Sequence, residues 1–421
     1  MFKRLVRKDG SVVLLVPKKD TQATTFEVLY KVGSRQEPAH LSGVSHFIEH
    51  LMFKGTPSRP HTADIARELD SVGAEYNAFT GKEHTGYYVM ADHGHLPMAM
   101  DTLSDMLHNS KLDPEEIERE KGVIIEEINM YEDNPLMYID DVFENLLYQG
   151  SVLGRSIAGT REIIRGVKRQ SLWNYYQKYY YHGNAVFGVA GNFDQVKFLR
   201  LLDKLFPISK KQARVTIKPV RIPKQTKPAL ALVNREVEQV QLMLGFRTMP
   251  GTDKRFLALQ LLANILGGTM SSRLFIKIRE RAGLCYFIRA EVNAYEDISL
   301  MAVHAGLNKD KIYEALEAIK EELNQVQREG VTEAELRQAK DNIRGRLILR
   351  LESSHSYLSF LSAQELWRQP IKDLNVTLKE LESVSLAQVN KLAKDIITWP
   401  QSNLAIIGPF NTDNKFLKIL K

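Results

Sequence analysis

An internal repeat constrains the fold of this chain more than any other feature of its sequence. Residues 184–194 and 403–411 share an apolar strand pattern that ends in glycine and asparagine. Residues 113–121 and 332–340 form a second similar pair at nearly the same offset, and each begins with a helix-capping residue followed by acidic residues. We therefore predict two duplicated domains of about 200 residues each.

A stretch rich in proline and lysine, residues 207–228, separates the two halves and is typical of a linker. A chain of 421 residues is also too long for one ordinary hydrophobic core. The predicted domains are residues 1–206 and 229–421, with the linker at 207–228 between them.

Each half shows the pattern of an α+β fold, in which helices flank a mostly antiparallel sheet. Strands are predicted at 11–16, 24–32, 73–80, 84–91 and 185–190, and in the second half at 229–234, 239–247, 284–294, 297–305 and 402–407. Helices are predicted near 43–53, 61–72, 94–109, 113–131, 137–148, 308–328 and 332–350.

The first half carries a chemical motif, His46-Phe-Ile-Glu49-His50. Two histidines four residues apart lie on one face of a helix, where both imidazoles reach one zinc ion. A third, acidic ligand would leave a position open for water, as a catalytic zinc requires. The alternative is a solvated polar helix face. The apolar stripe beside the motif favours the zinc site, because partly buried ionisable groups are costly unless paired or metal-bound.

Composition limits the other functional classes. The single cysteine, Cys285, allows no intrachain disulfide and fits a reducing compartment. No signal peptide and no apolar run long enough to span a membrane are recognised. The net charge of +6 is spread along the chain, which favours a solvated surface over a nucleic-acid interface. We therefore expect a cytoplasmic protein without membrane or nucleic-acid partners.

The motif and its surroundings resemble the pitrilysin/insulinase family of zinc peptidases, in particular the short-chain branch that includes the mitochondrial processing peptidase. His46, Glu49 and His50 match the family's inverted zinc motif, and residues 51–56 continue it. The segment 118–128 resembles the family segment with the distal ligand. The resemblance covers essentially the whole chain and implies that Glu127, not Glu126, is the third zinc ligand.

The resemblance also assigns roles outside the motif. Glu120 resembles the family's carboxylate that supports the metal site from behind, and residues Asn77, Ala78 and Phe79 resemble its substrate-facing edge strand. In the second half, Arg279 and Tyr286 resemble a family pair that binds substrate. The segment equivalent to the zinc motif, residues 263–267, lacks metal ligands, so this half contributes only the arginine and the tyrosine.

These matches imply a zinc endopeptidase with one Zn²⁺ per chain. Glu49 would act as general base, Tyr286 would donate a hydrogen bond to the oxyanion, and Arg279 would bind a substrate carbonyl or carboxylate. The family's two halves face each other across a cleft, so we expect unfolded peptides or presequence-like segments as substrates. Because one chain carries both the zinc motif and the Arg/Tyr pair, we expect a homodimer. The alternative is a non-catalytic scaffold or partner subunit of the same fold.

A possible specificity element follows the zinc-binding segment. Asp140 and Glu144 are four residues apart on a predicted helix and share a face. They resemble the acidic pair with which the mitochondrial processing peptidase holds a basic residue, although the preceding segment is a few residues longer here. The two carboxylates either select an arginine or lysine of the substrate or form an ordinary solvated acidic face.

Overall fold

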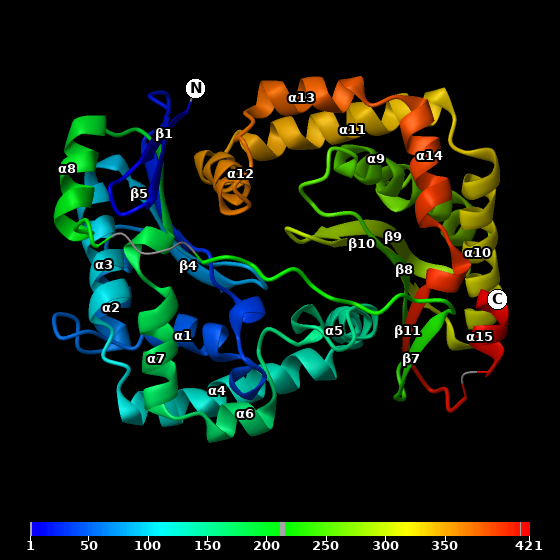
Figure 1. Cartoon of the computed structure of the whole chain (residues 1–421), viewed down its shortest axis with the longest axis horizontal. Helices are drawn as coiled ribbons and strands as arrows, with labels where there is room; N and C mark the ends of the chain where they lie inside the picture. The colour runs from blue at the N-terminus through cyan, green and yellow to red at the C-terminus, as the bar shows by residue number, and fades with distance from the viewer. Residues whose placement is uncertain (1, 211–214, 413) are drawn as a thin grey trace. The chain divides into compact units, whose positions relative to one another are not determined.

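The computed structural model describes residues 2–210, 215–412 and 414–421, and these residues form two compact units. Unit 1 contains the described residues of Met1–Ile128, Arg155–Lys218 and Leu349–Asp373. Unit 2 contains those of Asn129–Gly154, Pro219–Ile348 and Leu374–Lys421. Figure 1 follows the chain through both units by colour.

Unit 1 is built on a six-stranded sheet with the order β1-β2-β6-β3-β5-β4. Strands β2 and β6 are parallel, and every other neighbouring pair is antiparallel. The strands are β1 (Lys3–Val6), β2 (Val12–Pro17), β3 (Ala23–Tyr30), β4 (Glu75–Thr80), β5 (Thr85–Asp92) and β6 (Ala185–Gly191).

Unit 2 contains a five-stranded sheet with the order β7-β11-β8-β10-β9. Its strands are β7 (Ala229–Asn234), β8 (Val240–Thr248), β9 (Cys285–Ala294), β10 (Ser299–Leu307) and β11 (Asn403–Gly408). This order repeats that of unit 1 without β1, and the pair β7–β11 is parallel as β2–β6 is. The predicted α+β class is confirmed, and the common strand order is the structural counterpart of the sequence repeat.

Helices accompany both sheets. Unit 1 has α1 (Val44–Met52), α2 (Thr62–Asp70), α3 (Leu96–Asn109), α6 (Arg161–Gly166), α7 (Arg169–Tyr179), α8 (Gln195–Leu205) and α12 (Ser354–Leu366), and α4 (Pro114–Asp133) begins in it. Unit 2 has α5 (Pro135–Leu147), α9 (Phe256–Gly267), α10 (Ile312–Glu329), α13 (Leu374–Ser383), α14 (Leu386–Ile396) and α15 (Asn414–Leu420), and most of α11 (Glu333–Leu351). None of the helices that the structure describes is long and apolar enough to cross a membrane.

Two helices lie outside the predicted domain boundaries. Helix α5, from the first half of the sequence, packs against β7, β8 and β11 of unit 2. Helix α12, from the second half, packs against β2, β3 and β6 of unit 1. Each covers the sheet with an apolar face, for example Phe143 of α5 and Leu358 of α12, both fully buried. The boundaries at 206 and 229 assigned each helix to its own half, because sequence order does not show which sheet a helix covers.

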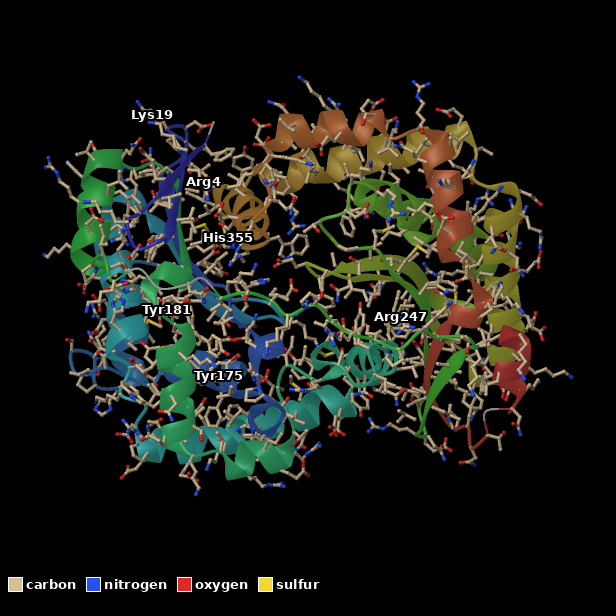
Figure 2. The ribbon with its side chains drawn as sticks, viewed as in Figure 1. Arg4, Lys19, Tyr175, Tyr181, Arg247 and His355 are labelled. Atoms are coloured by element: carbon tan, nitrogen blue, oxygen red, sulfur yellow. The ribbon has the colours of Figure 1, made fainter. Side chains whose placement is uncertain are left out.

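Polar and aromatic contacts also hold α12 against the sheet of unit 1. The guanidinium of Arg4 donates two hydrogen bonds to Glu365, at 2.6 and 2.9 Å. The ring of His355 lies 4.2 Å from that of Tyr88, measured between centroids. Figure 2 labels Arg4 and His355, one residue from each of these two contacts. In the middle, Ser359 donates a hydrogen bond to the fully buried carboxyl group of Glu27 on β3.

The buried Glu27 should make stability depend on pH. Burial raises the pKa of Glu27 to about 7, whereas an unfolded chain has the ordinary value near 4.5. The folded protein therefore holds more protons between these values, and stability falls as pH rises from about 5 to 7. The loss should amount to about 2–3 kcal/mol at most. We expect Glu27→Gln, which cannot ionise, to remove this part of the decline in unfolding midpoints measured over pH 5–8.

Glu352→Gln is the matched control, because that side chain is exposed and precedes the same helix. It should leave the pH dependence unchanged. An unaltered decline in Glu27→Gln would show that the Glu27 carboxyl group is not the titrating group.

Candidate metal centre

Helix α1 presents the histidine motif, and its first turn is anchored by Glu37. The Glu37 carboxylate accepts hydrogen bonds from the backbone N–H groups of Gly43 and Ser45, both at 2.7 Å. These donors have no partner within the helix, so the two carboxyl oxygens of Glu37 satisfy them. Gly43 has a φ of 96°, and a side chain there would collide with the carbonyl oxygen of Ala158. The start of α1 is therefore tightly determined.

The rest of α1 follows from its amphipathic sequence. Its apolar residues are fully or almost fully buried: Val44, Phe47, Ile48, Leu51 and Met52. The opposite side carries His46, Glu49 and His50, which point away from this core. Burial of one face thus holds the three polar side chains in a fixed direction.

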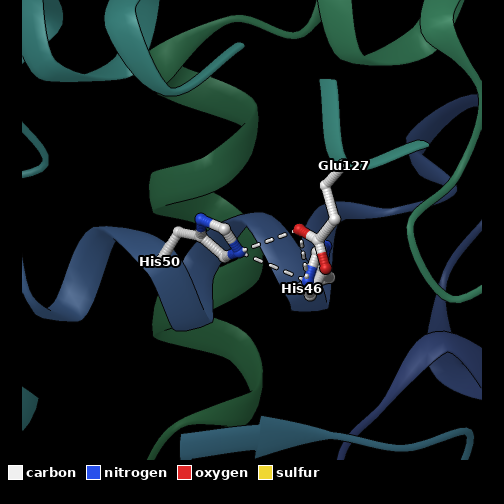
Figure 3. Close-up of side chains that lie close together, drawn as sticks. All are labelled: His46, His50 and Glu127. Carbon is white, nitrogen blue, oxygen red and sulfur yellow. Dashed lines mark hydrogen bonds and ion pairs between the residues drawn. The ribbon is translucent and has the colours of Figure 1, made fainter. Parts of the chain in front are cut away.

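Helix α4 supplies the acidic side of the centre. Ile117, Ile124 and Ile128 are buried in the core of unit 1. Glu120 and Glu127, which are seven residues or about two turns apart, project from α4 toward the α1 motif. Figure 3 shows the carboxylate of Glu127 directed at the imidazoles of His46 and His50.

Three potential ligand atoms converge at this point. The Nε2 atoms of His46 and His50 are 3.3 Å apart, and each lies 3.5 Å from Oε2 of Glu127. Ligand atoms bonded to one tetrahedral zinc ion are separated by about 3.3–3.6 Å, given zinc–ligand bonds of about 2.0–2.2 Å. The two nitrogens and the oxygen therefore fit a zinc ion, and such a site leaves one position for water or substrate.

The protonation of the two histidines differs. Burial lowers the pKa of His46 to about 4, so this imidazole is neutral near pH 7. Burial also acts on His50, but hydrogen bonds with Glu120 and Glu127 outweigh it and raise its pKa to about 9. A metal ion between these side chains would replace the proton on His50, so zinc uptake should release protons.

His50 is also held from behind. Its Nδ1 atom lies 2.9 Å from Glu120, whose other carboxylate oxygen pairs with the ammonium group of Lys54 at 2.7 Å. Burial opposes ionisation of Glu120, but the hydrogen bonds from His50 and Lys54 prevail and lower its pKa. An ionised Glu120 orients the imidazole, which is how such carboxylates support zinc ligands in general. Within the described residues, Nδ1 of His46 has no hydrogen-bond partner, so only one ring is fixed in this way.

Glu49 occupies the place expected of a general base. It lies between the two histidines on α1, and its Oε2 atom is buried without a hydrogen-bond partner among the described residues. Burial raises the pKa of Glu49, which the Thr80 hydroxyl and His50 oppose and Glu127 reinforces. A carboxylate with raised basicity and a free oxygen beside a metal position can accept a proton there.

The predicted substrate-facing residues lie on β4, an edge strand of the unit 1 sheet. Asn77 and Phe79 are exposed, while Ala78 is buried toward the core. Helix α1 contacts this strand, so the edge runs close to the histidine motif. An edge strand offers unpaired backbone groups to an extended peptide.

Arg279 and Tyr286 belong to unit 2. Arg279 lies in a helical segment, Phe275–Arg281, with its guanidinium 4.7 Å from the centroid of the Phe275 ring. Tyr286 lies on the edge strand β9, and 55% of its surface is exposed. Both side chains are thus available to a ligand on this unit. Their roles toward substrate stay predictions.

The structure places the two residues of the predicted acidic pair in different surroundings. Glu144 is buried, and its carboxylate accepts hydrogen bonds from Tyr295 at 2.5 Å and Asn293 at 2.9 Å. Asp140 is exposed but has Glu291 nearby. Partial burial and then the charge of Glu291 raise the pKa of Asp140 to about 6. Only Asp140 resembles a surface acid, and its partner there is Glu291.

Three features of these sites escaped the sequence analysis. Lys54 lies two residues after the end of α1, and its closeness to the histidine motif is the only sequence signal for its pairing with Glu120. Glu37 precedes the helix by several residues, too far for an ordinary capping motif to reveal it. Glu291 approaches Asp140 only through the pairing of distant segments, for which the sequence contains no local signal.

Comparison with family models divides the chain into two matches. Residues 12–161 match the model described as "Insulinase (Peptidase family M16)", and residues 166–343 match the "Peptidase M16 inactive domain". The three converging ligands all lie in the first match. The second match contains Arg279 and Tyr286.

Similar proteins are found in several bacteria. The chain is 35% identical over 409 residues to an uncharacterized zinc protease of Bacillus subtilis, YmxG, covering 97% of this chain and 98% of the other. It is 31% identical over 411 residues to an uncharacterized zinc protease of Rickettsia felis, covering 96% of each chain.

Solved structures share the fold. A protease from Helicobacter pylori aligns with a TM-score of 0.90 and 23% identity, over 97% of this chain and 99% of the other. A peptidase M16 inactive domain protein from Pseudomonas fluorescens aligns with a TM-score of 0.89 and 16% identity, over 98% and 99% of the two chains. At these identities the likeness concerns the fold alone.

Neighbouring glutamates on α4 allow a direct test of the ligand set. We expect Glu127→Gln to lose most of its zinc at equilibrium, because an amide oxygen is a much poorer ligand than a carboxylate. The adjacent Glu126→Gln should keep zinc, since the Glu126 side chain is exposed and belongs to none of the contacts of the centre. Zinc content after dialysis against a weak chelator measures both. Equal retention in the two variants would contradict the assignment of Glu127.

Proposed function

This chain belongs to the insulinase family of peptidases, family M16, and on that premise we propose that it is a zinc-dependent endopeptidase. The observation that carries the proposal is the convergence of His46, His50 and Glu127 beside Glu49, whose Oε2 atom is buried without a hydrogen-bond partner among the described residues. A non-catalytic subunit would need neither a complete ligand set nor a base with raised pKa next to it.

The residues around the centre have separate tasks. When bound, a zinc ion supplies a Lewis acid that polarises the scissile carbonyl group and makes a nearby water more acidic. Oε2 of Glu49 accepts the proton of the attacking water and later returns it to the leaving amine. Glu120 keeps the His50 ring oriented, and Lys54 keeps Glu120 ionised. The burial of Glu49 favours this cycle, because it brings the basicity of the carboxylate nearer to the working pH.

Peptide binding would use the edge of unit 1. An extended substrate adds to β4 through backbone hydrogen bonds, which tolerate many sequences but require an unfolded or short chain. We further propose that Arg279 binds a substrate carbonyl or carboxylate and that Tyr286 donates a hydrogen bond to the oxyanion. Their exposure on unit 2 is consistent with contact to a ligand.

Specificity for a basic residue would rest on Asp140. Glu144 already accepts two hydrogen bonds inside unit 2, and separating it from them would leave these buried donors unpaired. Asp140 is exposed and lies beside Glu291, so a cation reaching it meets two acidic groups. Arg289 partly neutralises them, since its guanidinium pairs with Glu291 at 2.9 Å. We therefore propose a modest preference for arginine or lysine in the substrate.

The role of Glu49 is tested by replacing it with glutamine, which removes the base and leaves all three ligands. We expect Glu49→Gln to retain one zinc per chain and to lose cleavage of a quenched peptide by at least 10²-fold, the usual contribution of a general base. His46→Ala, measured alongside, should lose both zinc and activity.

A zinc-loaded Glu49→Gln protein as active as the parent would refute the general-base assignment. If the parent itself binds zinc but cleaves no member of a diverse library of unfolded peptides, the proposed function is wrong and the chain is a non-catalytic member of the family.

Asp140→Asn and Glu144→Gln should separate specificity from structure. Asp140→Asn should reduce the preference for peptides with arginine over matched peptides with alanine, with little change in stability. Glu144→Gln should lower the unfolding midpoint, because it weakens the bonds to Tyr295 and Asn293. The arginine preference is measured as the ratio of kcat/KM for the paired peptides, at low and at high salt. A full arginine preference in Asp140→Asn would exclude this residue as the selecting group.

A further inference from the structure

A second pair of histidines lies in unit 1, apart from the metal centre. His108 stands near the end of α3, and His182 lies in the short turn His182–Asn184 before β6. Their Nε2 atoms are 2.5 Å apart, and the ring of Phe206 packs against both imidazoles. Such a short contact between two ring nitrogens requires that something positively charged or a hydrogen atom lies between them.

The neighbours of each ring determine where its own proton sits. Nδ1 of His182 lies 2.8 Å from the backbone carbonyl oxygen of Pro207, which can only accept, so Nδ1 of His182 carries a hydrogen. Nδ1 of His108 lies 3.1 Å from the Ser104 hydroxyl oxygen and also interacts with the Ser104 carbonyl group. The hydroxyl itself donates to the carbonyl oxygen of Leu205 at 2.8 Å, so Nδ1 of His108 is a donor as well.

This hydrogen-bond network has one hydrogen fewer than it has contacts. It has four contacts: Leu205 with Ser104, Ser104 with His108, His108 with His182, and His182 with Pro207. A hydroxyl and two neutral imidazoles supply only three hydrogens, and both ends of the network are carbonyl oxygens. Turning the hydroxyl or changing a tautomer moves the deficit to another contact without removing it. With two neutral rings, one of the four contacts therefore brings two acceptor atoms together without a hydrogen between them.

The surroundings admit a cation from solvent. His108 and His182 line a pocket of about 690 Å³ that also contains Glu68, Asp101 and Asp105. Asp105 favours a positive charge at His108, and Asp9 favours one at His182. Arg7 opposes a charge at His182, and Arg59 and Lys204 on the pocket wall reduce its negative character. Burial lowers the pKa of His108 to about 4, an effect that His182 reinforces, and burial also lowers the pKa of His182.

We propose that His108 and His182 form a site for one cation, held between their two Nε2 atoms and independent of the metal centre. The cation is either a shared proton or a first-row divalent transition-metal ion, since imidazole nitrogen binds both. The separation of 2.5 Å fits a shared proton. A metal ion would require the rings to part, because two nitrogens on one ion are separated by about 2.9–3.4 Å for bonds of about 2.0–2.1 Å.

The test uses the full chain with His46→Ala and His50→Ala, so that the first metal centre contributes neither zinc binding nor histidine protonation to the measurements. In chelator, unfolding midpoints of this background and of the same chain with His182→Gln are compared over pH 5.5–8.5. A proton held more tightly in the folded state stabilises the background below pH about 6.5, the ordinary histidine value, and this advantage disappears as pH rises. The folded-to-unfolded ratio should change by up to about tenfold per pH unit.

A metal ion is detected in the same proteins at pH 7.5 with Zn²⁺ as the probe. The background should bind one Zn²⁺ and gain stability, whereas the His182→Gln and His108→Gln forms should do neither. His95→Gln, a replacement of an exposed histidine before α3, should behave like the background in both measurements. His108→Gln serves as the second variant if His182→Gln folds poorly.

Either a stabilising proton or a bound Zn²⁺ that depends on both histidines supports the site and identifies its occupant. The proposal is overturned if the advantage of the background stays constant or grows as pH rises through 6.5 and no Zn²⁺ is bound through the two histidines. That result would mean two neutral imidazoles with lowered pKa values, whose Nε2 atoms lie farther apart than 2.5 Å.

Discussion

The centre depends on the burial of one face of helix α1. Five apolar side chains of this short helix lie in the core of unit 1, each contributing about 1.5–3 kcal/mol through removal from water. Glu37 fixes the first turn, and Gly43 allows the chain to enter it at a positive φ. With the helix held in this way, His46, Glu49 and His50 have little freedom to turn aside. Apolar packing thus fixes the positions of the polar side chains of the centre.

Helix α4 completes the centre by the same principle. Its buried isoleucines hold Glu120 and Glu127 on one side, and the seven-residue interval brings both to α1. Lys54, Glu120 and His50 then form a chain of contacts that leads from the surface to a ligand. Three carboxylates and one ammonium around a divalent ion would balance in charge, which limits the cost of placing them in a half-buried site.

Much of this architecture could be predicted from local sequence. The alternation of residues located the main strands, and the repeat of sequence patterns anticipated two sheets with the same strand order. The spacing of the motif was sufficient for His46 and His50, because an i, i+4 pair needs only a helix. Glu127 and Glu120 required the family resemblance, since nothing local connects α4 to α1.

Other features depend on tertiary contacts that no local pattern encodes. The sequence does not show that α5 covers the sheet of unit 2 and α12 that of unit 1, because any apolar helix face can cover any apolar sheet face. Glu144 looked like a surface acid until Tyr295 and Asn293, which lie far along the chain, were found beside it. Strand β1 and helices α6, α7, α8, α9, α12, α13, α14 and α15 were not predicted. Most of them are short or have apolar patterns interrupted by charges, whereas α9 is apolar on nearly all sides and shows no clear helical period.

X-ray absorption at the zinc edge, recorded on the protein loaded with one equivalent of Zn²⁺, tests the central claim most directly. The account predicts two imidazole ligands and only nitrogen or oxygen donors in the parent, and no spectrum of such a site from His46→Ala, which loses the metal. A spectrum that shows a sulfur ligand, or one that is the same in His46→Ala as in the parent, would contradict the proposed centre.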